Sequence, residues 1–215
     1  MVRSPKGRWQ GAEAARRYVE DRWDSPRRAG RDPRLVRGAL ACQRVREPGA
    51  IVLDAPCGAA RLRPAIEAGG TRWVGLDASP AMLAAACAAG RPLLVGDVSA
   101  LPFADGAFDA VVCCRLLHHL AEEAAFRRAV AELVRVSRFL VVASFWDSRS
   151  LAAWRSRAFP RRDGRVPGRV THARERVREA FAAAGAEVIE FRPAWRFLSR
   201  QTFAVARKTA ASDHG

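Results

Sequence analysis

The sequence predicts an α/β protein built around a doubly wound, mostly parallel sheet. After residue 50, short apolar segments alternate with stretches of helical spacing, which is the pattern of strands joined by crossover helices. Nearly continuous apolar runs, such as residues 139–145, are typical of strands buried on both faces. A chain of 215 residues suits one domain with a single sizeable core.

Seven segments have strand character. They are residues 50–54, 72–77, 93–96, 107–114, 139–145, 187–191 and 201–206. The last two are separated by too few residues for a crossover helix, so we expect them to pair antiparallel. Helices are predicted over residues 13–23, 35–46, 61–68, 79–90, 122–136, 151–157 and 172–184. The third of these ends at a glycine pair, and the fourth opens with Ser79 as cap and Pro80 in the first turn.

The composition along the chain divides the predicted domain, residues 1–215, into five parts. Residues 1–48 form an N-terminal helical cap, in which residues 24–33 are a mobile link. Residues 49–146 form the core, and residues 147–170 are an Arg-rich insertion. Residues 171–207 contain a C-terminal helix and a β-hairpin, and residues 208–215 form a disordered tail.

The formal net charge of +15 raises the question of a polyanionic partner. The cations are almost all arginine, with Lys6 and Lys208 the only lysines. Such a skew also arises from GC-rich coding, which needs no partner. The arginines are spread along the chain, and no aromatic-interleaved RNA-binding motif is present. Nucleic-acid binding therefore stays an open alternative that the sequence does not favour.

The apolar segments, the N-terminus and the cysteines indicate where in the cell the protein is expected. Charges interrupt every apolar stretch before it reaches the roughly 18 residues that span a bilayer, and the N-terminus has no signal-peptide pattern. The five cysteines are an odd number without C-x-x-C spacing, and Cys87 and Cys113 lie in apolar stretches as core residues. We expect a cytoplasmic protein with no metal site.

A short loop joins the first predicted strand to the following helix at residues 54–61. Such a loop lies at the carboxyl edge of the sheet, where open α/β folds bind ligands. Gly58 lets the backbone approach a ligand closely. Asp77 ends the next strand about 20 residues further on, where an acid accepts hydrogen bonds from ribose hydroxyls. These features predict a cofactor that contains a nucleoside.

The charge of the loop indicates which kind of nucleoside. Dinucleotide-binding loops carry several glycines to hold a pyrophosphate, whereas this loop has only Gly58 and begins with Asp54. A carboxylate repels a pyrophosphate and attracts a sulfonium or an ammonium group. Asp97, after the third strand, is placed to accept a hydrogen bond from an adenine amine, with Val98 offering a backbone N–H and Leu101 an apolar wall. A cationic nucleoside is favoured over NAD.

Four motifs in this order and spacing resemble the class I S-adenosylmethionine (SAM)-dependent methyltransferases. The resemblance covers residues 50–146, and it is strongest to the branch with ubiquinone- and menaquinone-type enzymes. The motifs are residues 52–61, 74–83, 96–109 and 114–120. The resemblance implies a Rossmann-like, seven-stranded sheet with helices on both faces and an antiparallel last strand.

The resemblance also implies the residues that hold SAM. They are Asp54, Ala55, Pro56, Cys57, Gly58, Arg61, Asp77, Ala78, Met82, Asp97, Val98, Cys114 and Arg115. Two departures from the family pattern stand out. Pro56 and Ala60 replace glycines, which makes the loop stiffer and narrower, and Ala60 is a reason to expect weaker cofactor binding. Residues 134–139 lack the usual Pro-Gly-Gly turn, which predicts a shortened connection.

The acceptor side of the site has less distinctive residues. His118 and His119 follow the fourth strand and are the candidate catalytic bases, although one of them, by resemblance His119, is expected to be a packed loop residue. Tyr18 and Arg22 are candidates for a lid. Trp146, Trp154 and Trp195 are candidates for an apolar acceptor pocket, with core packing as the alternative. Arg155, Arg157, Arg161 and Arg162 are candidates for binding an anionic headgroup or phosphate of the acceptor, with a solvated surface as the favoured alternative. His172 is expected near a helix N-terminus without a special role.

The expected function is SAM-dependent methyl transfer to a small-molecule or lipid-like acceptor. The segment after the fourth strand carries His-His. It lacks an Asn/Asp-Pro-Pro-Tyr-type motif, the kind that would indicate a resemblance to enzymes that methylate amino groups of bases or glutamine. An RNA or nucleic-acid methyltransferase that uses the basic surface is the first alternative. A catalytically inactive cofactor-fold binding protein is the second, and a nicotinamide-dependent dehydrogenase comes last. The acceptor atom and the oligomeric state do not follow from the sequence.

Overall fold

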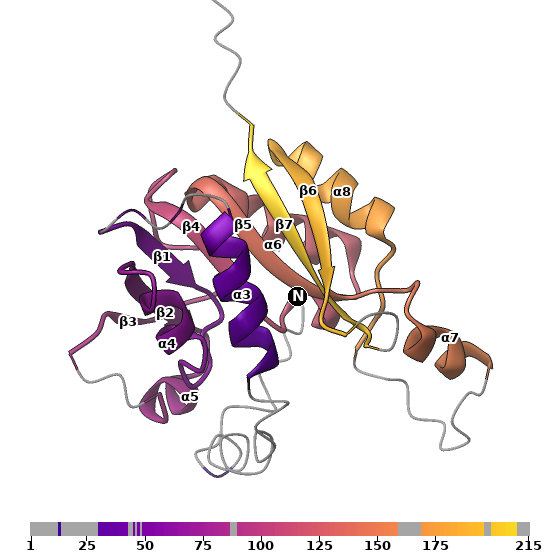
Figure 1. The fold of residues 1–215 in the computed structure, drawn as a ribbon, viewed down its shortest axis with the longest axis horizontal. Coiled ribbons are helices and arrows are strands. Elements are labelled where there is room, and N and C mark those ends of the chain that lie inside the picture. The colour runs from indigo at the N-terminus through magenta and orange to yellow at the C-terminus, as the bar shows by residue number, and fades with distance from the viewer. Residues whose placement is uncertain are drawn as a thin grey trace, which may run out of the picture.

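A seven-stranded sheet in the order β3-β2-β1-β4-β5-β7-β6 forms the centre of the protein in a computed structural model (Figure 1). The structure describes residues 13, 30–42, 45, 47, 49–86, 90–158, 169–195 and 199–209. The strands are β1 (Ile51–Asp54), β2 (Arg72–Asp77), β3 (Leu93–Val95), β4 (Phe108–Cys113), β5 (Ser137–Trp146), β6 (Ala186–Pro193) and β7 (Gln201–Lys208). Each predicted strand is present, with bounds shifted by a few residues.

The strand directions match the predicted mostly parallel sheet. β1 pairs in parallel with β2 and β4, and the parallel ladder continues to β3 on one side and β5 on the other. β7 is antiparallel to both of its neighbours, β5 and β6. The short link between β6 and β7 permits only this hairpin arrangement. The doubly wound sheet with an antiparallel last strand is confirmed.

Helices cover both faces of the sheet. They are α3 (Arg31–Cys42), α4 (Arg63–Glu67), α5 (Pro80–Ala84), η2 (Leu117–His119), α6 (Glu123–Val136), α7 (Leu151–Ala158) and α8 (Arg174–Ala183). α6 and α8 pack in one apolar cluster on one face, and α3 and α4 pack in a second cluster on the other. Figure 1 shows α3 on one side of the sheet and α7 standing apart at its edge.

The helix α6 shows how the sequence pattern builds this core. Phe126, Val130, Leu133 and Val134 recur at helical spacing, and all four side chains are fully buried. Burying one such side chain contributes roughly 1.5–3 kcal/mol. None of the helices in the described ranges is long and apolar enough to cross a membrane.

Two predicted helix bounds are wrong. α3 begins at Arg31, so the last residues of the predicted link, including Pro33, belong to its first turn. Proline is tolerated there because the N–H it lacks has no partner within the helix. The predicted helix 79–90 is shorter, since α5 ends at Ala84 and is followed by a turn at residues 85–86. Most of the predicted helix 13–23 lies outside the described residues.

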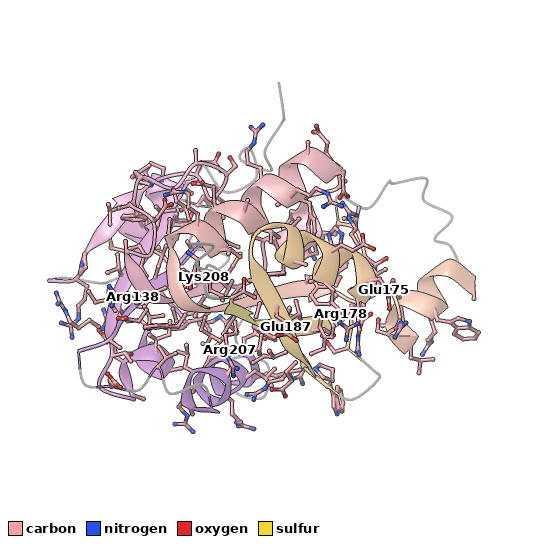
Figure 2. The ribbon with its side chains drawn as sticks, turned by 90° about the horizontal axis from the view of Figure 1, so that it is seen from above. Arg138, Glu175, Arg178, Glu187, Arg207 and Lys208 are labelled. Carbon is pink, nitrogen blue, oxygen red and sulfur yellow. The ribbon has the colours of Figure 1, made fainter. Side chains whose placement is uncertain are left out.

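The connection between α6 and β5 is as short as predicted, because α6 ends at Val136 and β5 begins at Ser137. The Nζ of Lys208 donates to the carbonyl oxygens of Arg135 at 3.2 Å and Ser137 at 2.9 Å. Figure 2 shows Lys208 at this junction near Arg138. A cation bound to the last carbonyls of a helix stabilises the C-terminus of that helix. Lys208 therefore stabilises the end of α6, where the Pro-Gly-Gly turn is absent.

Candidate active site

The loop after β1 is held by the two strands that flank β1. The N–H of Ala55 donates to the carbonyl oxygen of Val112 in β4 at 2.9 Å, and the N–H of Cys57 donates to that of Leu76 in β2 at 2.8 Å. The Ala55–Pro56 peptide bond is cis. Gly58 has a φ of +55°, and a Cβ there would lie 3.3 Å from the Cε of Met82. Glycine therefore suits both the backbone turn and the close approach of this side chain.

Asp77 at the end of β2 joins the loop to the next helix. Its Oδ2 accepts from the N–H of Gly58 and its Oδ1 from the N–H of Ser79, both at 2.8 Å. Burial raises the pKa of this carboxyl, while the backbone donors of Ser79, Gly58 and Ala78 oppose the rise. Ser79 caps α5 as predicted, because its Oγ accepts from the N–H of Met82 at 3.3 Å. The loop after β1 and the start of α5 thus share one carboxylate.

Asp54 at the end of β1 is fully buried and only partly satisfied. The Nε1–H of Trp73 donates to its Oδ2 at 3.3 Å, whereas Oδ1 has no hydrogen-bond partner among the described residues. Burial raises the pKa of Asp54 to about 7, against the lowering effects of Trp73 and Arg61. Gly75 makes room for the indole, since a Cβ there would lie 2.6 Å from Cζ2 of Trp73. A buried acceptor without a donor fits a ligand that brings one.

Asp97 follows β3, and its side chain makes hydrogen bonds within its own segment. Its Oδ1 accepts from the N–H of Ser99 at 3.0 Å and from the Oγ–H of Ser99 at 2.9 Å. The N–H of Gly96 donates to the carbonyl oxygen of Asp77 at 3.1 Å, which brings this segment beside the end of β2. Val98 and Leu101 are buried. The three predicted carboxylates therefore lie at the carboxyl ends of three adjacent strands.

The segment after β4 begins at the same edge of the sheet, beside the end of β1. Arg115 has a φ of +66°, a left-handed backbone that is rare for arginine, and its N–H donates to the Oγ of Ser144 in β5 at 2.7 Å. Cys114 is buried, and burial raises the pKa of its thiol to about 12, so that the thiol stays protonated at neutral pH. Cys113 is fully buried, as predicted for a core residue.

Asp32 is a residue that sequence reasoning missed. It lies in the first turn of α3, is 1% exposed, and was assigned to the mobile link. Its Oδ2 accepts from Nη2 of Arg61 at 2.7 Å and from Nε of Arg115 at 2.9 Å. Its Oδ1 accepts from Nε2 of Gln201 in β7 at 3.2 Å. The one signal in the sequence was an acid directly before a proline, which is typical of a helix start.

The two histidines after β4 have different environments. His118 is 3% exposed, and its ring stacks on Trp146 with centroids 4.8 Å apart and planes 5° apart. Burial, followed by the charges of His119 and Arg169, lowers the pKa of His118 to about 2, so that its ring is neutral at physiological pH. His119 is half-buried, 4.4 Å from His118 between centroids. The packed residue is therefore His118, and the expectation that it is His119 is wrong.

His172 has a structural role that the sequence did not indicate. It precedes α8, is buried, donates from Nε2 to the carbonyl oxygen of Leu117 at 2.9 Å and stacks on Phe126. Its own N–H donates to the carbonyl oxygen of Trp146 at 2.7 Å, while the N–H of Val170 donates to that of His118 at 2.8 Å. Residues 170–172 thus lie beside Trp146 and His118.

The other candidates are not all brought together. Trp146 stacks on His118, and the guanidinium carbons of Arg169 and Arg200 lie 5.4 and 5.3 Å from its ring centroid. Trp154 on α7 is 54% exposed, so core packing is wrong for it. Trp195 is also exposed, with Arg31 over its ring. The exposed Arg155 is consistent with a solvated surface. Predictions for Tyr18, Arg22, Arg161 and Arg162, and for the side chains of Arg157 and Cys87, lie outside the described residues.

This chain is similar to known proteins in sequence and in fold. Residues 53–139 match the family described as a methyltransferase domain. The demethylmenaquinone methyltransferase of Mycolicibacterium vanbaalenii is 38% identical over 98 residues, which cover 46% of this chain and 43% of that protein. That of Corynebacterium efficiens is 37% identical over 92 residues, covering 43% of this chain and 39% of that protein. The match spans less than half the length of these curated relatives.

Solved structures share the fold at lower identity. Magnesium protoporphyrin IX methyltransferase from Synechocystis PCC 6803 with bound SAH has a TM-score of 0.68 and 19% identity, covering 84% of each chain. A possible exported protein from Bordetella parapertussis has a TM-score of 0.71 and 20% identity, covering 95% of this chain and 81% of that one. The predicted fold and the family resemblance of the core are thereby confirmed.

Proposed function

We propose that this chain, with its methyltransferase-domain core, binds SAM and transfers the methyl group to a small-molecule or lipid-like acceptor. The observation that carries the proposal is the row of Asp54, Asp77 and Asp97 at three adjacent strand ends, with Gly58 held against Asp77 at 2.8 Å. Three acids on one edge suit a cationic nucleoside and oppose a pyrophosphate.

Each acid has a role that its surroundings fit. Asp77 keeps lone pairs for ribose hydroxyls after accepting two backbone N–H groups, because each carboxylate oxygen accepts more than one hydrogen bond. Asp97, with the backbone of Val98, suits the adenine edge. The unpartnered Oδ1 of Asp54 suits the positive end of the cofactor. Bound SAM supplies an activated methyl group on a sulfonium.

The protein's contribution to transfer is mainly positioning. Holding two reactants in line supplies as much as roughly 7–11 kcal/mol of a barrier. A base is needed only when the acceptor loses a proton. His118, whose pKa of about 2 makes it a weak base, orients its neighbours through its stack on Trp146. We assign proton acceptance to the half-buried His119.

The charge of the acceptor side suggests which acceptors suit it. Arg169 and Arg200 lie over the Trp146 ring, next to the buried His118. Positive charges near the reacting atom favour the ionised form of an acidic hydroxyl. An acceptor such as a phenol or an enol, with an apolar body, fits this environment. The names of the curated relatives, which are demethylmenaquinone methyltransferases, point to the same class.

The test is transfer from methyl-labelled SAM to three fractions of a bacterial extract: lipids, aqueous small molecules and RNA. We expect label in the lipid or small-molecule fraction, and its loss with Asp77→Asn. The matched control is Asp109→Asn, because Asp109 also accepts from a backbone N–H, that of Ile51 at 2.8 Å, but at the opposite end of β1. Label in RNA alone would replace the proposal with the nucleic-acid alternative, and no label in any fraction would contradict it.

A further inference from the structure

We infer that Asp32 is a positioning residue of the cofactor site, which neutralises part of the charge of Arg61 and Arg115 so that these arginines do not repel a sulfonium. The inference rests on the proposed function, since it concerns the charge of the bound cofactor. Its basis is the buried carboxylate of Asp32 in α3, which accepts hydrogen bonds from Arg61, Arg115 and Gln201 in three other segments of the chain.

The contacts of Asp32 connect the cofactor loop to the rest of the sheet. Arg61 follows the loop after β1, and Arg115 follows β4 in a left-handed backbone conformation. Both guanidinium groups donate to Oδ2 of Asp32, at 2.7 and 2.9 Å, and Gln201 of β7 donates to Oδ1 at 3.2 Å. One carboxylate therefore fixes the side chains of two segments that border the proposed cofactor.

Asp32 carries a buried negative charge between two arginines. The side chain of Asp32 is 2% exposed, while those of Arg61 and Arg115 are 20% and 27% exposed, so solvent screens the cluster only in part. The carboxylate of Asp32 offsets one unit of the positive charge that Arg61 and Arg115 carry, and its loss removes that offset. The field reaches the cofactor loop, because Arg61 lowers the pKa of the buried Asp54. Asp32 likewise raises the pKa of the Cys114 thiol while Arg61 and Arg115 lower it.

This electrostatic role can be separated from a merely structural one. SAM and its product S-adenosylhomocysteine (SAH) have nearly the same shape, but only SAM carries a positive charge on sulfur. A distorted loop would weaken both ligands alike, whereas an uncompensated positive charge would weaken SAM alone. The ratio of the two dissociation constants therefore reports the charge effect.

The experiment measures Kd for SAM and SAH by calorimetry at about pH 8 in the wild type and in Asp32→Asn. We expect SAM affinity to fall on the order of tenfold more than SAH affinity, since a tenfold change corresponds to about one pKa unit of interaction. Arg115→Gln, which removes a positive charge, should shift the ratio in the opposite direction. It tests the inference even if Asp32→Asn does not fold. The double variant should return the ratio toward the wild-type value.

Asp147→Asn is the matched control. Asp147 is also a buried carboxylate with an arginine partner, Arg174 at 2.7 Å, but it follows β5 on the acceptor side. Its loss should leave the ratio unchanged. Equal weakening of SAM and SAH by Asp32→Asn, or a ratio unmoved in both Asp32→Asn and Arg115→Gln, would overturn the inference while the proposed function stands. A folded wild type that binds neither ligand would refute the proposed function and this inference with it.

Discussion

The two sides of the sheet's carboxyl edge are built from opposite chemistry. The proposed cofactor side, after β1, β2 and β3, carries the carboxylates of Asp54, Asp77 and Asp97. Backbone N–H groups donate to Asp77 and Asp97, and the Trp73 indole donates to Asp54. The acceptor side, after β4 and β5, presents stacked rings of His118 and Trp146 under arginine side chains. One side favours a cation, and the other favours an anionic or aromatic group.

The two sides also differ in how far the family match covers them. The cofactor side lies within residues 53–139, the range that matches the methyltransferase domain. Trp146, Arg169 and His172 of the acceptor side lie beyond that range, and residues 170–172 reach the site through hydrogen bonds to Trp146 and His118. Changes on the first side should therefore affect cofactor binding, and changes on the second should affect transfer.

The largest expected effect is on the cofactor side. Asp77→Asn removes the negative charge of the side chain and one of the two oxygens that accept from the N–H groups of Gly58 and Ser79. We expect SAM affinity to fall by more than about 100-fold, which corresponds to the loss of two charge-assisted hydrogen bonds. Calorimetry measures this directly. Asp109→Asn should lower the melting temperature without a comparable loss of affinity. Similar affinity losses in the two variants would mean that Asp77 acts through stability alone.

A large effect of a different kind is expected on the acceptor side. His119→Ala should lower kcat about 100-fold by removing the proposed base, while SAM affinity stays unchanged. His118→Ala should mainly lower the melting temperature, because it removes a buried ring that stacks on Trp146. Steady-state kinetics and thermal denaturation of both variants separate the roles. If His118→Ala alone loses kcat while its fold is intact, the assignment is reversed.

The pH dependence of the cofactor side follows from Asp54, whose folded-state pKa is raised from 3.8 to about 7. The folded protein then holds a proton that the unfolded chain releases, so the contribution of Asp54 to stability decreases as pH rises from about 4 to 7. Asp54→Asn should therefore stabilise the protein at pH 8 by up to about 4 kcal/mol, roughly three pKa units, and by little at pH 4. Chemical denaturation at the two pH values measures the difference.

The same carboxyl should make cofactor binding depend on pH. SAM affinity of the wild type should weaken as pH falls below about 7, since Asp54 becomes neutral. In Asp54→Asn this dependence should disappear, with affinity lower at pH 8. A flat pH profile in the wild type would show that the cofactor does not depend on this charge.

The smallest effect is expected from Ala60→Gly. Ala60 has a φ of +55°, which costs a non-glycine residue about 1–2 kcal/mol, but its buried methyl group, worth about 0.8 kcal/mol, packs in the cluster beneath α3. These terms differ by at most about 1.2 kcal/mol, so the melting temperature should change by only a few degrees and SAM affinity should change little. An affinity gain above about threefold would instead support the expectation that Ala60 narrows the loop.

The strand ends and their acids were predictable because local pattern determines them. An apolar run followed by an acid and a loop places Asp54 and Asp77 at the carboxyl edge whatever packs around the sheet. Local pattern likewise predicted the N-cap at Ser79, and the absence of a Pro-Gly-Gly turn predicted a shortened connection between α6 and β5. Each of these features depends on residues that are close in the chain.

The remaining features depend on tertiary packing that the pattern does not encode. Asp32 meets Arg61, Arg115 and Gln201, which are 29, 83 and 169 positions away in the sequence. The choice between His118 and His119 depends on which ring of a short 3-10 turn meets Trp146. Nothing in the sequence of these neighbours distinguishes the buried residue from the half-buried one.

The most direct test of the central claim is calorimetric titration of the folded wild-type protein with SAM, beside an identical titration with NAD. The row of three carboxylates predicts micromolar binding of SAM and no heat from NAD. Absence of SAM binding in a sample whose cooperative thermal unfolding shows that it is folded would contradict the account.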